Sequence, residues 1–182
     1  MPWTKPLLAG AFAAAFASSA LAWDFGRPAT PEEIALWDID VRPDGKGLPD
    51  GNGTPAQGKV VYQQNCEACH GPNGQGGLKD RLAGGQGTLA SENPVKTVGS
   101  YWPYATTLFD YIHRAMPYPT PGALSNDDTY AVAAYILNLN GIVPDDAKLD
   151  KDSLPKIRMP NRDGFIADKV FAPDRPNGAK VR

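Results

Sequence analysis

Cysteine and histidine are scarce in this chain of 182 residues, which has two of each. Two cysteines exclude a small fold held together by several disulfides. Long apolar runs are absent after residue 22, so we expect no membrane span in the mature protein. Dense runs of basic residues are absent as well, which argues against a nucleic-acid-binding protein.

Both cysteines and one histidine fall in a single string, CEACH, formed by Cys66, Cys69 and His70. C-x-x-C-H is the pattern through which a chain attaches a c-type haem. Each cysteine sulfur forms a thioether with one vinyl group, and the histidine becomes the proximal ligand of the iron. A redox-active C-x-x-C motif is not followed by a histidine. A zinc site needs another pair of Cys or His residues, and His113 is the one Cys or His residue left in the chain. The motif therefore predicts one covalent haem c.

Residues 1–22 have the features of an export signal. Lys5 precedes the apolar run LLAGAFAAAFASSALA, and Ala20 and Ala22 form an A-x-A cleavage site. The run is short and rich in small residues, which disfavours a membrane anchor. We expect the mature chain to begin at Trp23 and to lie in the periplasm, on the oxidising side of a membrane.

Three further segments follow the signal. An N-terminal extension over residues 23–53, with one brief helix near Pro31, is expected to pack on the haem domain of residues 54–144. A C-terminal extension over residues 145–182 is basic, whereas the body of the protein is acidic. The 18 prolines and 19 glycines favour a helical core wrapped in irregular chain.

Two helices are expected to cross at the heart of the haem domain. The first begins with Thr54 as N-cap and Pro55 at the first helical position. Gly58 within it predicts close packing against another backbone, because a helical glycine otherwise costs about 1 kcal/mol. The partner is the helix that starts at Ser125 and ends at Asn140, where Ala133, Ala134, Tyr130 and Tyr135 could accept the crossing. Crossed terminal helices are typical of class I cytochromes c.

A third helix, spanning residues 105–115, predicts the second axial ligand of the iron. Met116 and Pro117 end this helix, and a proline-rich turn follows that could carry a thioether across the distal face. Met116 is therefore the expected distal ligand, which would close the iron and raise its potential. His113, Met159 and an open coordination site are the alternatives.

Three longer strings narrow the family: FGRPATPEEIALWDIDVRPDGKGLP, TVGSYWPYATTLFDYIHRAMP and LPKIRMPNRDGFI. They resemble the cytochrome subunits of periplasmic molybdenum sulfite dehydrogenases, and the first haem domain of the sulfane dehydrogenase cytochrome subunit. The resemblance implies an all-α class I cytochrome c fold. It also implies that Cys66 and Cys69 attach the haem, and that His70 and Met116 are its ligands.

The resemblance implies an electron-transfer subunit that is not itself an enzyme. A molybdenum sulfite dehydrogenase would donate electrons singly to the haem, and a downstream cytochrome c or terminal oxidase would accept them. The alternative is a haem enzyme, or a cytochrome of a sulfane- or thiosulfate-oxidising system, with a displaceable sixth ligand.

Overall fold

The computed structural model describes residues 26–166, so the predicted export signal and the end of the basic extension lie outside the described residues. The chain divides into two units, Met1–Trp37 and Asp38–Arg182. Between residues 26 and 166, no helix has the length and apolar character needed to cross a membrane.

The described part of the first unit contains one short helix, α2 (Pro31–Ala35). Thr30 caps it through a reciprocal pair of side-chain and backbone hydrogen bonds with the third helical residue, which is the expected pattern for this proline-led start. The side chains of Ile34, Leu36 and Trp37 are exposed. The packing of this segment on the haem domain stays a prediction.

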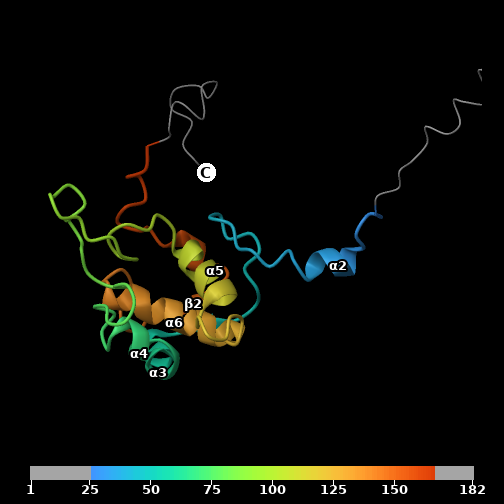
Figure 1. Ribbon diagram of the computed structural model, residues 1–182, viewed down its shortest axis with the longest axis horizontal. Coiled ribbons are helices and arrows are strands. Elements are labelled where there is room, and N and C mark those ends of the chain that lie inside the picture. The colour runs from blue at the N-terminus through green and yellow to red at the C-terminus, as the bar shows by residue number, and fades with distance from the viewer. Residues whose placement is uncertain (1–25, 167–182) are drawn as a thin grey trace, which may run out of the picture. The chain divides into compact units, whose positions relative to one another are not determined.

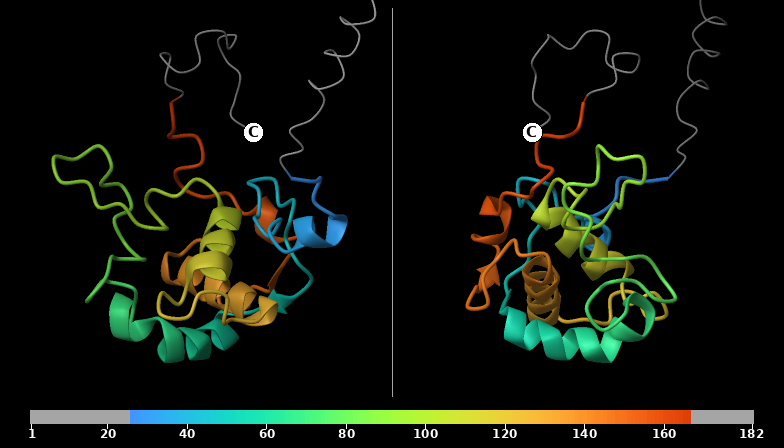
Figure 2. Two further views of the ribbon diagram at one scale, coloured as in Figure 1. Left: turned by 45° about the vertical axis from the view of Figure 1, so that its right-hand side comes forward. Right: turned by 90° about the vertical axis from the view of Figure 1, so that its left-hand side faces the viewer.

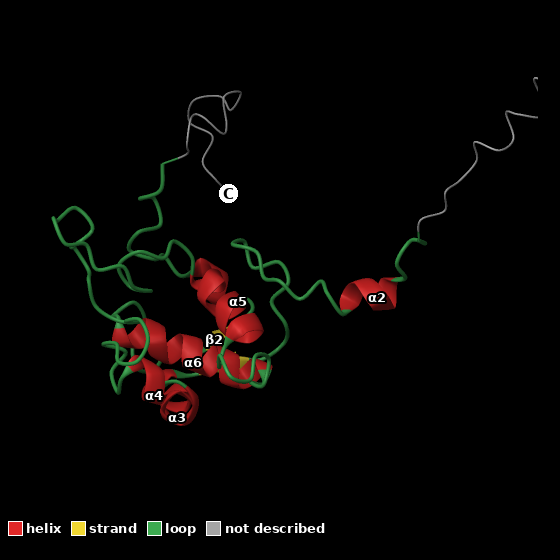
Figure 3. Cartoon of the chain, viewed as in Figure 1, coloured by secondary structure: helices red, strands yellow, loops and turns green. Residues whose placement is uncertain are grey.

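The second unit is built around α6 (Asn126–Leu139), whose residues from Thr129 to Leu137 are all buried. The other helices are α3 (Pro55–Asn65), α4 (Glu67–His70), α5 (Ala105–Ala115) and the 3₁₀ helix η2 (Leu154–Lys156). Both α3 and α5 pack on α6, and Figures 1 and 2 show α3 beside α6 with α5 crossing it. Most of the remaining chain is loop (Figure 3).

The predicted helix ends are confirmed. Thr54 accepts a hydrogen bond from the Gln57 N–H at the start of α3, and Ser125 accepts one from the Asp128 N–H at the start of α6. The Asp128 carboxylate also accepts a hydrogen bond, but its donor is the Ser125 hydroxyl and not the Ser125 backbone N–H. Gly141 follows α6 with a φ of +67°, a conformation that glycine adopts without strain.

Gly58 lies where α3 and α6 meet, as expected. A Cβ atom at this position would overlap the backbone carbonyl of Ala131 and would also press on the Cβ of Tyr135. The helix crossing therefore uses Tyr135, as the sequence suggested, and brings Gly58 nearest to Ala131, which the sequence analysis did not name. The Tyr62 ring then packs against the Tyr135 ring, with centroids 5.2 Å apart.

Residues 38–53 and 145–166 both cover this helical core. The two-residue strands β1 (Asn52–Gly53) and β2 (Leu149–Asp150) pair antiparallel, and β1 and β2 both lie against α6. The Tyr130 hydroxyl of α6 donates to the Pro49 carbonyl at 2.9 Å. Leu154 and Met159 are buried in the hydrophobic core, so the Met159 side chain has the packing role that is usual for methionine.

We expect Gly58→Ala to destabilise the protein, although alanine is the better helix former by about 1 kcal/mol. Its methyl group would meet backbone atoms of α6, which cannot rotate away, and overpacking of this kind costs about 1–3 kcal/mol or more. Urea unfolding of the haem-loaded protein, followed by far-ultraviolet circular dichroism, measures the change. Gln64→Ala, at an exposed position of α3, is the control, and equal stability of both variants would contradict the close contact.

Candidate functional site

The CEACH string forms a tight turn at the end of α3. Helix α3 stops at Asn65, and Cys66 links it to α4. The N–H groups of Cys69 and His70 donate to the Cys66 carbonyl at 3.1 and 3.0 Å. Side chains three and four residues apart share one face of a helical turn. The two thiols, which are free and half-buried, are therefore presented together with the imidazole.

The imidazole of His70 is oriented by the loop that follows it. Its Nδ1 lies 2.7 Å from the backbone carbonyl of Asp80. A carbonyl oxygen can only accept, so Nδ1 carries the proton and Nε2 keeps its lone pair. No described residue hydrogen-bonds Nε2. A metal-binding histidine is usually held in this way, with one nitrogen on a carbonyl and the other directed to the metal.

The cysteines fit haem attachment better than the other two chemistries considered for them. Burial raises the pKa of the Cys66 thiol to about 11, with a further contribution from Cys69. Redox-active C-x-x-C cysteines show the opposite shift. Among residues 26–166, no three side chains of the His, Cys, Asp and Glu types are grouped to hold a metal ion, as a zinc site would require. The residues present therefore fit a covalently attached haem.

The glycine-rich segment after the motif folds back on it. The Lys79 N–H donates to the Cys69 carbonyl at 2.9 Å, and the Gly76 N–H donates to the His70 carbonyl at 2.8 Å. The Tyr62 hydroxyl of α3 donates to the Gly71 carbonyl at 2.7 Å from the buried side. The motif is thus fixed by its own loop and by the helix that precedes it.

Asn140, at the end of α6, holds the far part of this loop, a role that the sequence analysis missed. Its side-chain amide donates to the carbonyls of Leu82 (3.1 Å) and Ile136 (2.9 Å), and its carbonyl oxygen accepts from the Gly84 N–H (3.1 Å). The residue is 9% exposed. An asparagine before a glycine predicts a helix end, but it gives no signal of a partner more than fifty residues away.

Met116 follows the last residue of α5 and leaves the helix in an extended conformation. Its half-buried side chain packs against the hydrophobic core. His113 lies one turn earlier, with its ring stacked on Phe109 at a centroid distance of 5.6 Å. Its Nδ1 is buried and has no hydrogen-bond partner in the described chain. Met116 stays the predicted distal ligand, and His113 stays the alternative on the same helix.

The aromatic residues before α5 are engaged in packing. The Trp102 ring meets the Tyr111 ring edge to face at 5.9 Å, and the Tyr101 ring meets Phe165 in the same way at 5.1 Å. Such pairs each add about 0.5–1.5 kcal/mol to the burial of their surface. They fix the chain that leads into α5.

Comparison with known proteins places this site in a family. The family model for cytochrome c matches residues 55–140. Thiosulfate dehydrogenase of Stutzerimonas stutzeri (strain A1501) is 32% identical over 116 residues, which are 61% of this chain but only 35% of that protein. A chain from the crystal structure of the sulfane dehydrogenase SoxCD from Paracoccus pantotrophus is 43% identical, with a TM-score of 0.78. That match covers 88% of this chain and 80% of the other, and it confirms the predicted fold class.

We expect Asn140→Ala to lower the free energy of unfolding by about 1–3 kcal/mol, because the Leu82 carbonyl and the Gly84 N–H lose their partner in a partly buried place. Hydrogen exchange of the Gly84 amide should accelerate in the variant. Asn93→Ala, at an exposed position of the same loop region, is the control. An unchanged exchange rate at Gly84 would show that Asn140 does not hold the loop.

A pH dependence follows from Tyr62, whose pKa is raised to about 12 by burial. The folded protein favours the neutral phenol, so this stabilising contribution is complete below about pH 10 and is lost as the pH rises through about 12. Urea unfolding between these pH values should show a shallower decline for Tyr62→Phe than for the wild type. Tyr118→Phe, with its ring on an exposed residue, should follow the wild type. If the unfolding free energies of all three proteins fall in parallel as the pH rises, Tyr62 does not contribute this pH dependence.

Proposed function

The chain belongs to the c-type cytochromes of sulfur-oxidising systems, and on that basis we propose a specific place for it in electron transfer. It is an electron-transfer protein with covalently attached haem c. In the proposed function it accepts electrons one at a time from a molybdenum sulfite dehydrogenase and passes them to a downstream cytochrome c or terminal oxidase. The likeness to a chain of the SoxCD structure, over 88% of this chain, supports electron transfer beside a sulfur-oxidising enzyme. Sulfite dehydrogenase as the donor rests on the three strings that resemble the cytochrome subunits of such enzymes.

Four side chains have distinct roles in this proposal. Cys66 and Cys69 form the thioethers that fix the haem to the end of α3. His70 is the proximal ligand, with its orientation set by the Asp80 carbonyl. Met116 would be the second protein ligand, and ligation by a thioether together with histidine would favour the reduced iron. The haem supplies a centre that takes up and releases a single electron.

The same residues support a carrier rather than an enzyme. If His70 and Met116 both hold the iron, no site would be left for a substrate, and catalysis at the haem would also need a positioned acid or base. The aromatic stacking of His113 on Phe109 gives that histidine a packing role. The proposed location is the periplasm, supported by the export signal expected in residues 1–22.

A second candidate function is electron transfer in a sulfane- or thiosulfate-oxidising system. It is favoured by the names of the two similar proteins, a thiosulfate dehydrogenase and a sulfane dehydrogenase. In that reading the donor is a different sulfur dehydrogenase, or the haem reacts directly with a sulfur compound through a displaceable Met116. The two candidates differ in the source of the electron and share the same haem site.

Substitution of Met116 tests the distal ligand. We expect Met116→Leu to abolish the near-infrared absorption band of methionine-ligated ferric haem, because leucine keeps the volume and removes the thioether. Met159→Leu is the matched control and should retain the band, since Met159 packs in the core. If the band is lost only in Met159→Leu, or is already absent from the wild type, Met116 is not the distal ligand.

Mixing experiments then separate the two functions. The oxidised protein is combined with sulfite and catalytic amounts of a molybdenum sulfite dehydrogenase, and haem reduction is followed by absorbance. Rapid reduction that requires both enzyme and sulfite supports the first proposal. Reduction by thiosulfate without any added enzyme would instead support the second one.

A further inference from the structure

The carbonyl that orients His70 belongs to an exposed stretch of chain. Residues 77–81 are all exposed, and Asp80, whose carbonyl lies 2.7 Å from the His70 Nδ1, is one of them. Exposed backbone gains little stability from packing, so hydrogen bonds at the two ends of the stretch decide where this carbonyl lies. The orientation of the imidazole therefore depends on the residues that anchor these ends.

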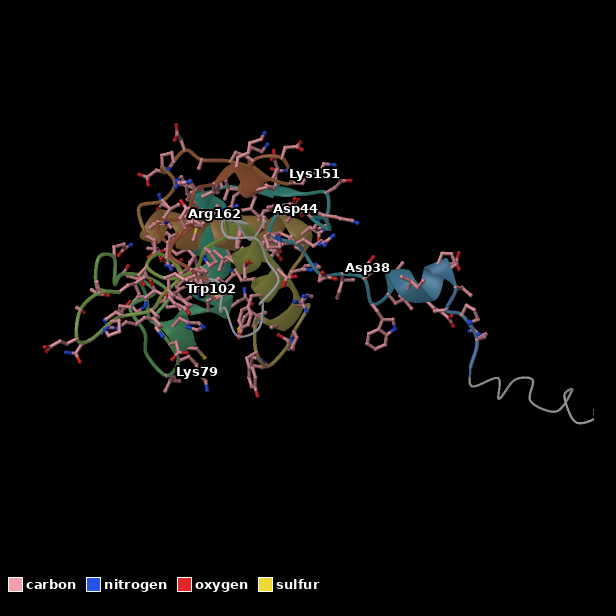
Figure 4. All side chains as sticks on the ribbon, turned by 90° about the horizontal axis from the view of Figure 1, so that it is seen from above. Asp38, Asp44, Lys79, Trp102, Lys151 and Arg162 are labelled. Carbon is pink, nitrogen blue, oxygen red and sulfur yellow. The ribbon has the colours of Figure 1, made fainter. Side chains whose placement is uncertain are left out.

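The end before Asp80 is anchored by the haem motif. The Lys79 N–H donates to the Cys69 carbonyl at 2.9 Å, and the Lys79 carbonyl accepts from the Gly77 N–H at 3.1 Å. Figure 4 shows Lys79 near the green ribbon of the motif, at the lower edge of the view. This anchor fixes the stretch relative to the motif at one end.

The end after Asp80 is anchored by Asn140. Its Nδ2 donates to the Leu82 carbonyl at 3.1 Å, and its Oδ1 accepts from the Gly84 N–H at 3.1 Å. A further bond from Nδ2 to the Ile136 carbonyl, at 2.9 Å, fixes the Asn140 side chain on the end of α6. Asn140 therefore joins the buried helix to a backbone carbonyl only two residues from that of Asp80.

The side chain of Asn140 has little freedom to move. The residue is 9% exposed. A Cβ atom at Gly99 would overlap the Asn140 Oδ1, so the chain at Gly99 passes directly against the amide. The hydrogen bonds of Asn140 are thus held in one arrangement, and they hold the Leu82–Gly84 segment in one arrangement as well.

We propose that Asn140 is a positioning residue that sets the reduction potential of the haem through the hydrogen bond between the Asp80 carbonyl and the His70 Nδ1. The inference rests on the proposed role of His70 as proximal ligand. A carbonyl that accepts from Nδ1–H makes the imidazole a stronger electron donor through Nε2, which stabilises ferric iron. Asn140 therefore keeps the potential lower than it is when the Asp80 carbonyl is free to move away.

Redox titration of the haem-loaded protein tests the proposal with Asn140→Ala. At a fixed ambient potential we expect the equilibrium to shift about three- to ten-fold towards reduced haem, which is about 30–60 mV in the positive direction for one electron. A general loosening of the site gives the opposite sign, because entering water stabilises the more highly charged ferric haem. An unchanged or lower potential would overturn the proposal.

Two further variants separate Asn140 from its surroundings. The Gln86 side chain donates to the backbone and side-chain oxygens of Asn140 at 3.2 and 3.3 Å, but it lies beyond the 80–84 segment, so Gln86→Ala should leave the potential unchanged. Gly99→Ala keeps the asparagine and displaces its amide, so it should raise the potential as Asn140→Ala does. A rise in Gln86→Ala equal to that in Asn140→Ala would overturn the specific role of Asn140.

Hydrogen exchange in the reduced wild-type protein provides a test that does not depend on the folding of any variant. If Asn140 controls the position of the Asp80 carbonyl, the His70 Nδ1–H and the Gly84 amide become accessible in the same opening event. Proton magnetic resonance should then show equal protection of the two hydrogens and the same dependence on urea. Exchange of the Gly84 amide while the Nδ1–H stays protected would overturn the proposal.

The outcome for Asn140 can be told apart from the outcome for the proposed function. If sulfite and a sulfite dehydrogenase do not reduce the wild type, the proposed donor is wrong, and the potentials still decide the role of Asn140. If His70→Ala keeps the haem absorption spectrum of the wild type, His70 is not the ligand, and both proposals are overturned.

Discussion

The backbone contact between α3 and α6 at Gly58 is the constraint on which the rest of the structure depends. Without a side chain at Gly58, α3 comes close enough for its backbone to meet the Ala131 carbonyl. This contact fixes the position of Tyr62, one turn later, whose hydroxyl reaches the Gly71 carbonyl just after the CEACH motif. The end of α3, and with it the haem attachment point, is therefore placed by a contact made two turns earlier.

The other end of α6 completes the same arrangement. Asn140 binds the loop at Leu82 and Gly84, and the loop in turn brings the Asp80 carbonyl to His70. One helix thus supports the motif from two sides, directly through its packing on α3 and indirectly through the loop. A ligand histidine needs such support, because its orientation is set by what its second nitrogen binds.

The segments outside the two crossed helices complete the hydrophobic core of the second unit. Residues 38–53 and 145–166 cover α6 and add Val41, Leu154 and Met159 to the core, which matters for a small domain with limited surface to bury. The C-terminal segment also brings Lys156 and Arg162 to the start of α5.

Local signals in the sequence were enough to predict much of this protein. The C-x-x-C-H motif predicts the covalent haem, and Thr54, Ser125 and Gly141 predict helix ends, because capping depends on residues within a few positions of one another. The end of α5 follows in the same way from the Met116–Pro117 pair. The strings that resemble sulfur-oxidation cytochromes were enough to predict the family as well.

Only the tertiary structure decided which groups meet across long separations. It placed Gly58 against the Ala131 carbonyl, because the helix crossing depends on the rotation and offset of α6. It brought Asn140 to Gly84 and Arg162 to Tyr104, and it buried Met159 in the core. These contacts join residues that share no local pattern, so the sequence by itself determined the haem motif and the helices, and folding determined what surrounds them.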